Sequence, residues 1–333
     1  MCSFFNKGFF TQYATVFVTG LLLWLPSAFM QPTMATPDGN FGTLLGFINF
    51  SAINVHPVVA VVSAFLFVFI TGLFVNRLAN DYGLSGKTST LTLLFFVLLT
   101  GFSPSFHQWS ASVLALPLIT LLFILLFKHY HGENNLFLSF DAGFVTGLLT
   151  LIYPPLALLI IVVLISMLSF KGVSWRNFPI SLVGLVFPPF LVYAYYFFTG
   201  NESYFLNIFH IHIGLNFNRF YLSLSFNSAL LWLSAIFLFF SSVKVLRQQS
   251  NLSIQQRSYF SIIGISLLML LFIQMLLSSQ TETALLLAPA GALTMDNLMT
   301  NSTLKAKWIS AIIFVFILSS IVNAYLPFAH VIK

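Results

Sequence analysis

The sequence has 333 residues, of which 59% are hydrophobic and only 6% are charged, and its mean hydropathy is +0.97. Soluble domains carry about 25% charged residues, so this composition excludes a soluble globular protein and predicts an all-α, polytopic membrane protein. The net charge of +6 does not predict a nucleic-acid partner, because the basic residues lie between apolar segments and report membrane topology. The single cysteine, Cys2, excludes an internal disulfide bond and a cysteine-based metal cluster.

About eleven segments are apolar enough to be spans, each of which needs about 20 residues, or fewer where neighbours support it. They lie near residues 12–30, 55–77, 89–103, 110–128, 137–153, 155–170, 178–199, 226–243, 259–278, 284–299 and 308–326. The third and the tenth are short, so whether they cross fully stays open. No stretch is polar enough to form a soluble domain, and we expect one transmembrane domain over residues 1–333.

The basic residues predict which ends of these segments lie in the cytoplasm. With the amino terminus inside, eleven of the 13 lysine and arginine residues fall in cytoplasmic loops. These are Lys7, Arg77, Lys87, Lys128, Lys171, Arg176, Lys244, Arg247, Arg257, Lys305 and Lys307. Only Arg219 and Lys333 then lie outside, and this asymmetry predicts a cytoplasmic amino terminus.

Two long loops then lie on the outer face. The first, residues 31–55, has a polar turn followed by Phe41–Ile53, which we expect to lie in the membrane interface as an amphipathic helix. The second, residues 200–225, is rich in aromatic residues and is expected to rest at the level of the lipid headgroups. The inner loops are short and carry no glycine-rich nucleotide-binding motif, so an ATP-driven pump is not expected.

Asp38 is the only acidic residue of the first outer loop, in the sequence Pro37-Asp38-Gly39-Asn40. This sequence is typical of a β-turn, which is one interpretation of the residue. The other is a general base that deprotonates an acceptor hydroxyl for attack on a lipid-linked donor. The two roles are compatible.

Arg219 is the one basic residue of the second outer loop and lies among aromatic residues. A guanidinium at headgroup depth binds a phosphate through two parallel hydrogen bonds, although it can equally hold an ordinary anionic lipid or pair with Glu202. His210 and His212, in the same loop, are candidate contacts to a lipid phosphate. Glu202 is the only acidic residue near them, so the loop predicts no metal site; we expect no resident cofactor, and a divalent cation stays open.

Further polar residues lie within spans or at their ends. His56 and His107 lie near the outer ends of spans two and three, where either can assist chemistry in an outer cavity. Asp141 is expected to cap the start of a span, and Gly143–Gly147 forms a small-residue surface for close helix packing. Asp296 is the one acidic residue within a predicted span, which is typical of a functional carboxylate unless it lies at the cytoplasmic end of that short span.

Three segments resemble an uncharacterised family of integral membrane proteins from Bacteroidota, known as a domain of unknown function. They are Arg77–Asp81, Asp141–Tyr153 with the following Pro154-Pro155, and Lys171–Arg176. The resemblance extends over most of the chain. It implies a multi-pass protein of the bacterial inner membrane and no particular activity.

The broader layout resembles that of C-type glycosyltransferases, polytopic enzymes that use polyprenyl-phosphate sugars outside the cytoplasmic membrane. In that superfamily the first outer loop carries an acidic catalytic residue and continues through interfacial helices into span two, which are the places of Asp38 and Phe41–Ile53 here. The resemblance implies that Asp38 is the catalytic base and that Arg219 holds the donor phosphate. The chain departs from the family pattern in having one acid in the first loop and none in Ser103–Trp109.

The sequence therefore predicts a glycosyltransferase-like protein that transfers a sugar from a polyprenyl-phosphate donor at the outer face of the inner membrane. Two alternatives stay open. One is a non-catalytic scaffold of a cell-envelope complex, which would bind a membrane-protein partner through a surface such as Gly143–Gly147. The other is a transporter or flippase for a lipid-linked solute, which needs a polar path lined by Asp296, Asn297 and Gln274.

Overall fold

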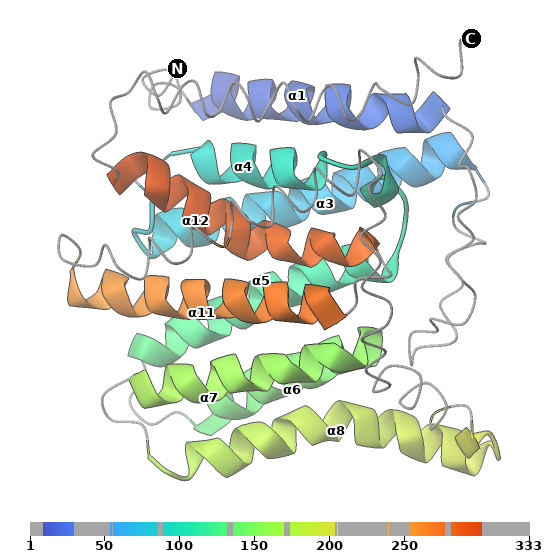
Figure 1. The fold of residues 1–333 in the computed structure, drawn as a ribbon, viewed down its shortest axis with the longest axis vertical. Coiled ribbons are helices and arrows are strands. Elements are labelled where there is room, and N and C mark those ends of the chain that lie inside the picture. Colours follow the sequence, from blue (N-terminus) through green and yellow to red (C-terminus); the bar gives the residue numbers. More distant parts are fainter. Residues whose placement is uncertain are drawn as a thin grey trace.

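The computed structural model describes residues 9–29, 54, 56–85, 89–131, 136–169, 174–203, 205, 239, 253–276 and 281–301. Within these residues the fold is all-helical and contains no strand, as the composition predicts, and the long helices lie side by side in one bundle (Figure 1). The helical segments are α1 (Phe9–Phe29), α3 (Pro57–Asp81), α4 (Leu91–Thr100), η2 (Pro104–Phe106), α5 (Ala111–His131), α6 (Leu136–Ile152), η3 (Pro154–Leu158), α7 (Leu159–Ser169), α8 (Asn177–Phe198), α11 (Ile254–Leu276), η5 (Thr281–Leu287) and α12 (Ala288–Asn301).

Nine of the predicted spans coincide with helices in the part of the chain that the structure describes. The other two, residues 226–243 and 308–326, lie outside the described residues except for Phe239. In the part of the chain that the structure describes, four helical stretches are long and apolar enough to cross a membrane, which supports the membrane-protein character of the chain. These stretches are Pro57–Asp81, Ala111–His129, Asn177–Phe198 and Ile254–Gln274.

Proline and glycine set several helix boundaries. Pro57 is the first residue of α3, where its missing N–H leaves no hydrogen bond unmade. Gly83 (φ 63°) follows α3, and Gly200 (φ 74°) follows α8, each in the left-handed conformation that glycine adopts without strain. Behind Gly83, the Leu84 N–H donates to the Ala79 carbonyl at 2.8 Å, which satisfies a carbonyl that the helix end would otherwise leave open.

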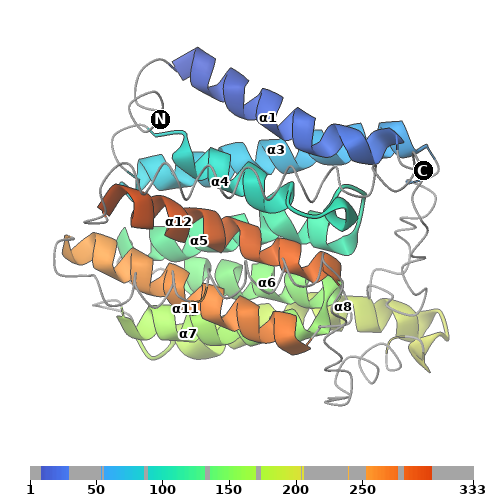
Figure 2. The same ribbon diagram turned by 45° about the horizontal axis from the view of Figure 1, so that its top comes forward.

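Helix α4 lies between α1 and α12, near the α1 edge of the helix row (Figure 1). All ten of its residues are buried, because α1, α3 and α12 enclose it (Figure 2). With a rise of 1.5 Å per residue it extends over only about 15 Å, half the thickness of a hydrocarbon core. Residues 101–110 follow α4 and turn back into α5, and we call them the α4–α5 hairpin.

Helices α6 and α8 pack closely through glycine. A Cβ atom on Gly143 would meet the Ser181 carbonyl oxygen at 2.0 Å, and one on Gly147 would meet the Leu185 carbonyl oxygen at 2.5 Å. The Gly143–Gly147 surface is therefore a close-packing surface, as predicted, but α8 of the same chain covers it. It is not the exposed docking surface that the scaffold interpretation required.

The cap role predicted for Asp141 is wrong. Helix α6 begins at Leu136, and Asp141 lies exposed in its second turn, with no acidic residue in the first. The apolar residues Leu136 and Phe137 continue the helix beyond the point at which the acidic side chain suggested a start.

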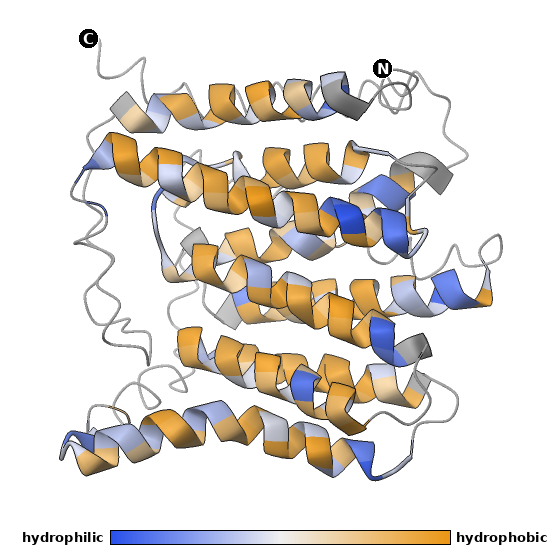
Figure 3. Ribbon diagram, turned by 180° about the vertical axis from the view of Figure 1, so that it is seen from behind, coloured by the Kyte–Doolittle hydropathy of each residue, from blue (hydrophilic) through white to orange (hydrophobic). Residues whose placement is uncertain are grey.

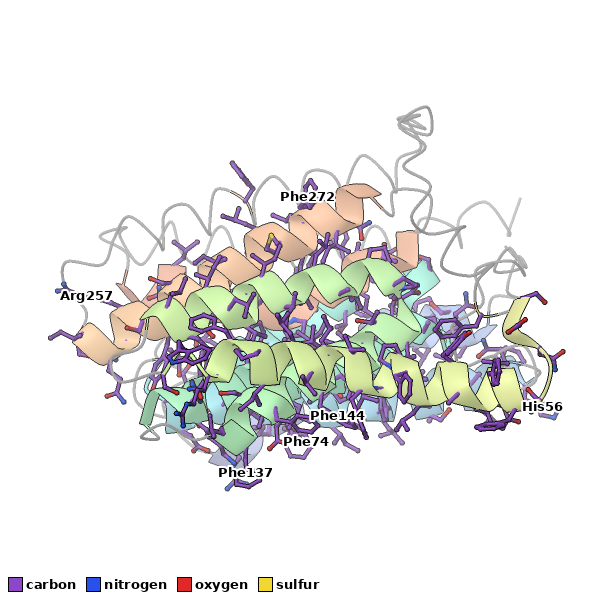
Figure 4. The ribbon with its side chains drawn as sticks, turned by 90° about the horizontal axis from the view of Figure 1, so that it is seen from below. His56, Phe74, Phe137, Phe144, Arg257 and Phe272 are labelled. Carbon is purple, nitrogen blue, oxygen red and sulfur yellow. The ribbon has the colours of Figure 1, made fainter. Side chains whose placement is uncertain are left out.

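Hydrogen bonds divide the helix termini into two opposite ends of the bundle. At one end, Thr90 donates to Gln12, Asn76 to Tyr13, and Gln256 to the Gly83 carbonyl. The described lysine and arginine residues all lie at this end, which we call the basic end. They are Arg77 on α3, Lys128 on α5, Arg176 before α8 and Arg257 on α11. Figure 4 shows Arg257 at this end and His56 at the other. The middle of the bundle is coloured as hydrophobic and the helix termini as more hydrophilic (Figure 3).

Candidate functional site

The α4–α5 hairpin, at the end opposite the basic end, gathers polar side chains from distant parts of the chain. Gly101 ends α4, Pro104 begins the short helix η2, and η5 packs against η2. The hairpin contains no α-helix but is largely buried, with Ser103, His107 and Ser110 all under a tenth exposed. Backbone of this kind is tolerated at membrane depth only where protein or a water-filled cavity surrounds it.

Two contacts with α1 hold the His107 side chain in place. Its ring stacks on the indole of Trp24, with centroids 4.4 Å apart and an interplanar angle of 27°. Its Nδ1 atom shares a hydrogen bond of 2.5 Å with the hydroxyl of Ser27, near the end of α1. Burial lowers the pKa of the His107 imidazole from 6.5 to about 3, so the ring is neutral at physiological pH.

Trp109 and Asn54 connect the hairpin to the residues that precede α3. The Trp109 N–H donates to Asn54 Oδ1 at 3.2 Å, and Asn54 Nδ2 donates to the Trp109 carbonyl at 3.0 Å. The indole Nε1 of Trp109 donates to the Ser63 hydroxyl at 2.8 Å, which orients the ring. His56 lies beside this connection as the N-cap residue of α3, and its side chain is exposed and makes no capping bond.

These contacts attach both ends of the first long loop to the hairpin. Ser27 precedes residues 31–55 and bonds to His107, while Asn54 ends the loop and bonds to Trp109. The catalytic candidate Asp38 lies between these two attachments, outside the described residues. Of the predicted site residues, the structure therefore brings His56 and His107 to one end of the bundle and leaves Asp38 untested.

The second long loop starts at the same end of the bundle, but from its other edge. Phe205, at the start of this loop, packs against Tyr193 of α8, with ring centroids 5.3 Å apart. Helices α1 and α8 lie at opposite edges of the helix row in Figure 1. Arg219, His210 and His212 lie outside the described residues. The chain from Gly200 to Arg219 can extend over roughly 60 Å, so an approach to the first loop is within reach.

Asp296 belongs to a separate, buried contact. It is 1% exposed on α12, and the Thr92 hydroxyl of the buried helix α4 donates to its Oδ2 at 2.6 Å. Gln274 instead bonds to Thr283, where α11 leads into η5, at the far end of the bundle from Thr92. Gln274 therefore does not lie with Asp296 and Asn297 on one polar path.

Among the described residues, no group of three or more histidine, cysteine, aspartate or glutamate side chains is placed to hold a metal ion. The contacts of Ser27, Trp24 and Asn54 were not foreseen from the sequence. The serine-rich sequence of the hairpin, Ser103-Pro104-Ser105 with Ser110 and Ser112, was the available signal, since such residues are uncommon in an apolar segment.

The chain has no match among protein-family models, curated proteins or solved structures.

Proposed function

We propose that the chain crosses the bacterial inner membrane eleven times with its amino terminus in the cytoplasm, so that the basic end is inside and the hairpin is outside. Support comes from the four described basic residues, all at one end, because cytoplasmic loops carry an excess of lysine and arginine. Exposed apolar side chains on α3 and α8, such as Val59 and Phe190, suit contact with lipid tails.

The proposed activity is transfer of a sugar from a polyprenyl-phosphate donor to an acceptor hydroxyl at the outer face. Asp38 removes the proton of the acceptor hydroxyl, the acceptor oxygen forms a bond to the anomeric carbon, and polyprenyl phosphate leaves with the electron pair of the broken bond. Arg219 binds the phosphate of the donor and of the departing product through paired hydrogen bonds, and His210 and His212 contact the same phosphate.

The observation that carries this proposal is the attachment of both ends of the Asp38 loop to the hairpin, through Ser27–His107 and Asn54–Trp109. Catalytic groups act only when they are held in a defined position, and a loop of 25 residues with two anchored ends meets that requirement better than a free one. His107 is a positioning residue in this arrangement, because its Nδ1 is engaged by Ser27. His56 is exposed and remains free to contact a substrate.

The direct test compares Asp38→Asn with Asp141→Asn. Membranes that contain each variant are supplied with radiolabelled polyprenyl-phosphate hexoses, and released polyprenyl phosphate is measured. Loss of a general base lowers the rate by about 100-fold to 10,000-fold in Asp38→Asn, whereas Asp141, exposed on α6, leaves it unchanged. Full activity of Asp38→Asn at normal membrane levels contradicts the proposal.

The shared site is tested separately by cross-linking. In a Cys2→Ser background, Asp38→Cys and Arg219→Cys are expected to cross-link with a short bifunctional thiol reagent. The pair Asp38→Cys and Arg257→Cys is the control that must not react, because Arg257 lies at the basic end (Figure 4). If the first pair does not cross-link, the two loops lie apart and Arg219 has no role in the site.

The buried contact of Asp296 favours one second candidate, transport of a lipid-linked solute. A carboxylate that bonds to a wholly buried helix is the kind of group that proton-coupled carriers use. Reconstituted protein that moves such a solute between leaflets, and loses this ability in Asp296→Asn but not in Asp38→Asn, selects the transporter over the transferase.

A further inference from the structure

The basic end of the bundle exposes large apolar side chains as well as charges. Four of the five most exposed large apolar side chains among the described residues lie at this end. They are Phe137 (82%) on α6, Leu168 (73%) on α7, Trp175 (76%) before α8 and Ile254 (77%) on α11. Apolar surface of this extent is unfavourable in water, so something apolar covers these side chains.

The elements that carry these side chains are neighbours. Helix α6 packs against α5 and α8, α8 against α7, and α7 against α11. Figure 4 shows Phe137 and Arg257 at the same end of the bundle, away from His56. The helix ends therefore form one continuous surface, which we call the basic rim. Its members are Lys128, Phe137, Leu168, Trp175, Arg176 and Ile254.

The basic rim has positive charges to satisfy. Lys128 and Arg176 are exposed, and neither forms an ion pair within the part of the chain that the structure describes. Arg77, by contrast, is paired with Asp81 on α3 at 3.4 Å, and Asp141 is the other exposed acidic residue described at this end. A phosphate diester supplies the opposite charge, and a guanidinium binds it through two parallel hydrogen bonds.

Continuity with the lipid-facing surface indicates what covers the basic rim. Exposed apolar side chains continue from it along the helices, among them Val183 and Phe190 on α8 and Phe272 on α11. The bilayer that contacts these side chains contacts the rim at the depth of the headgroups, where tryptophan is enriched. A nucleic acid or a soluble acidic protein would satisfy the charges but leave the four apolar side chains in water.

We propose that the basic rim is a binding site for an anionic phospholipid, with Arg176 at the lipid phosphate and Trp175 beside the headgroup end of the acyl chains. Phe137, Leu168 and Ile254 contact the acyl chains of neighbouring lipids. The proposal rests on the membrane arrangement given above and not on the transferase, and it holds whichever side of the membrane the rim faces.

The test measures lipid contact at Trp175 by fluorescence quenching. The full-length protein is reconstituted in mixtures of phosphatidylglycerol and phosphatidylcholine, in which one of the two lipids carries bromine atoms near the headgroup end of an acyl chain. The signal of Trp175 is the difference between the wild type and Trp175→Phe. Both lipids are expected to quench this signal, and phosphatidylglycerol is expected to do so with a severalfold higher relative affinity.

The variant Arg176→Gln isolates the contribution of the guanidinium, and each variant is measured with and without Trp175→Phe. One basic residue near a membrane surface changes the affinity for anionic lipid by about fivefold, so the preference falls by about that factor. Arg176→Lys keeps the charge and most of the preference. Arg77→Gln is the matched control, because it removes the same charge from the same end, but from an exposed side chain that is already paired with Asp81.

Three results overturn the proposal. Absence of quenching by either lipid means that protein covers the rim. Equal quenching by both lipids means that the rim contacts lipid without selecting its charge. Equal losses in Arg176→Gln and Arg77→Gln mean that the preference reflects the total charge of the basic end. None of these results depends on the transfer activity of Asp38→Asn, so the lipid site and the transferase fail separately.

Discussion

His107 is fixed by groups from two parts of the chain: Trp24 and Ser27 on α1, and the Gly101 backbone of its own hairpin. The neutral ring stacks on the indole of Trp24 and also shares a hydrogen bond with the Ser27 hydroxyl. Loss of the ring therefore removes both the stacking on Trp24 and one of the two attachments of the first long loop, the bond to Ser27. We expect His107→Ala to be more disruptive than His107→Phe.

Protonation of His107 should destabilise the protein in acid. The unfolded chain takes up this proton below about pH 6.5, whereas the folded chain does so only near pH 3, because burial lowers the pKa to about 3. Stability contributed by the neutral ring is complete above pH 6.5 and is lost as the pH falls toward 3. At pH 4 the loss is about 3 kcal/mol, from 1.4 kcal/mol per pKa unit.

The measurement is thermal unfolding in nanodiscs at pH 7, 5 and 4, for the wild type and for His107→Phe. The variant begins less stable, because the Ser27 bond is absent, but its stability should change less between pH 7 and 4. Parallel curves for the two proteins would show that His107 does not carry the acid dependence.

A hydrogen bond from the Thr92 hydroxyl to the Asp296 carboxylate joins helices α4 and α12. Thr92→Val keeps the shape of the side chain and removes the donor, which should cost about 1–3 kcal/mol, because the carboxyl group beside it stays buried. Thr92→Ser keeps the hydroxyl and should recover most of this stability. Equal losses in both variants, measured by thermal unfolding, would assign the effect to packing of the methyl group instead.

The close packing of helices α6 and α8 depends on glycine, because a side chain at Gly143 would collide with the backbone of α8. Gly143→Ala places a methyl group 2.0 Å from a backbone oxygen that cannot rotate away, so the helices must separate, at a cost of about 3 kcal/mol. Gly83→Ala is the comparison: its Cβ has ordinary space, and only the left-handed backbone is strained, which costs about 1 kcal/mol. If Gly143→Ala proves the milder of the two, the close contact of α6 with α8 is wrong.

At the scale of the whole molecule, the sequence predicted where helices lie much better than what they touch. Segment boundaries follow from apolar runs and from breaks such as Tyr153-Pro154-Pro155, which separates α6 from α7. The pairs Ser27–His107, Asn54–Trp109 and Thr92–Asp296 join residues 80, 55 and 204 positions apart, and no local pattern encodes them. The wrong prediction of a cap at Asp141 has the opposite cause. The preference of aspartate for helix starts was given more weight than the apolar residues before it, which extend α6 to Leu136.

The described lysine and arginine residues lie at one end of the bundle, which predicts the side of the membrane that each end faces. In a Cys2→Ser background and in inverted and right-side-out vesicles, Arg257→Cys should react with an impermeant thiol reagent only from the cytoplasmic side, and Asn201→Cys only from the outside. The physical reason is that lysine- and arginine-rich ends are retained in the cytoplasm. Reaction of both from one side would break the alternation of helix ends, and the reverse assignment would place the hairpin in the cytoplasm, where polyprenyl-phosphate sugars of the outer face cannot reach it.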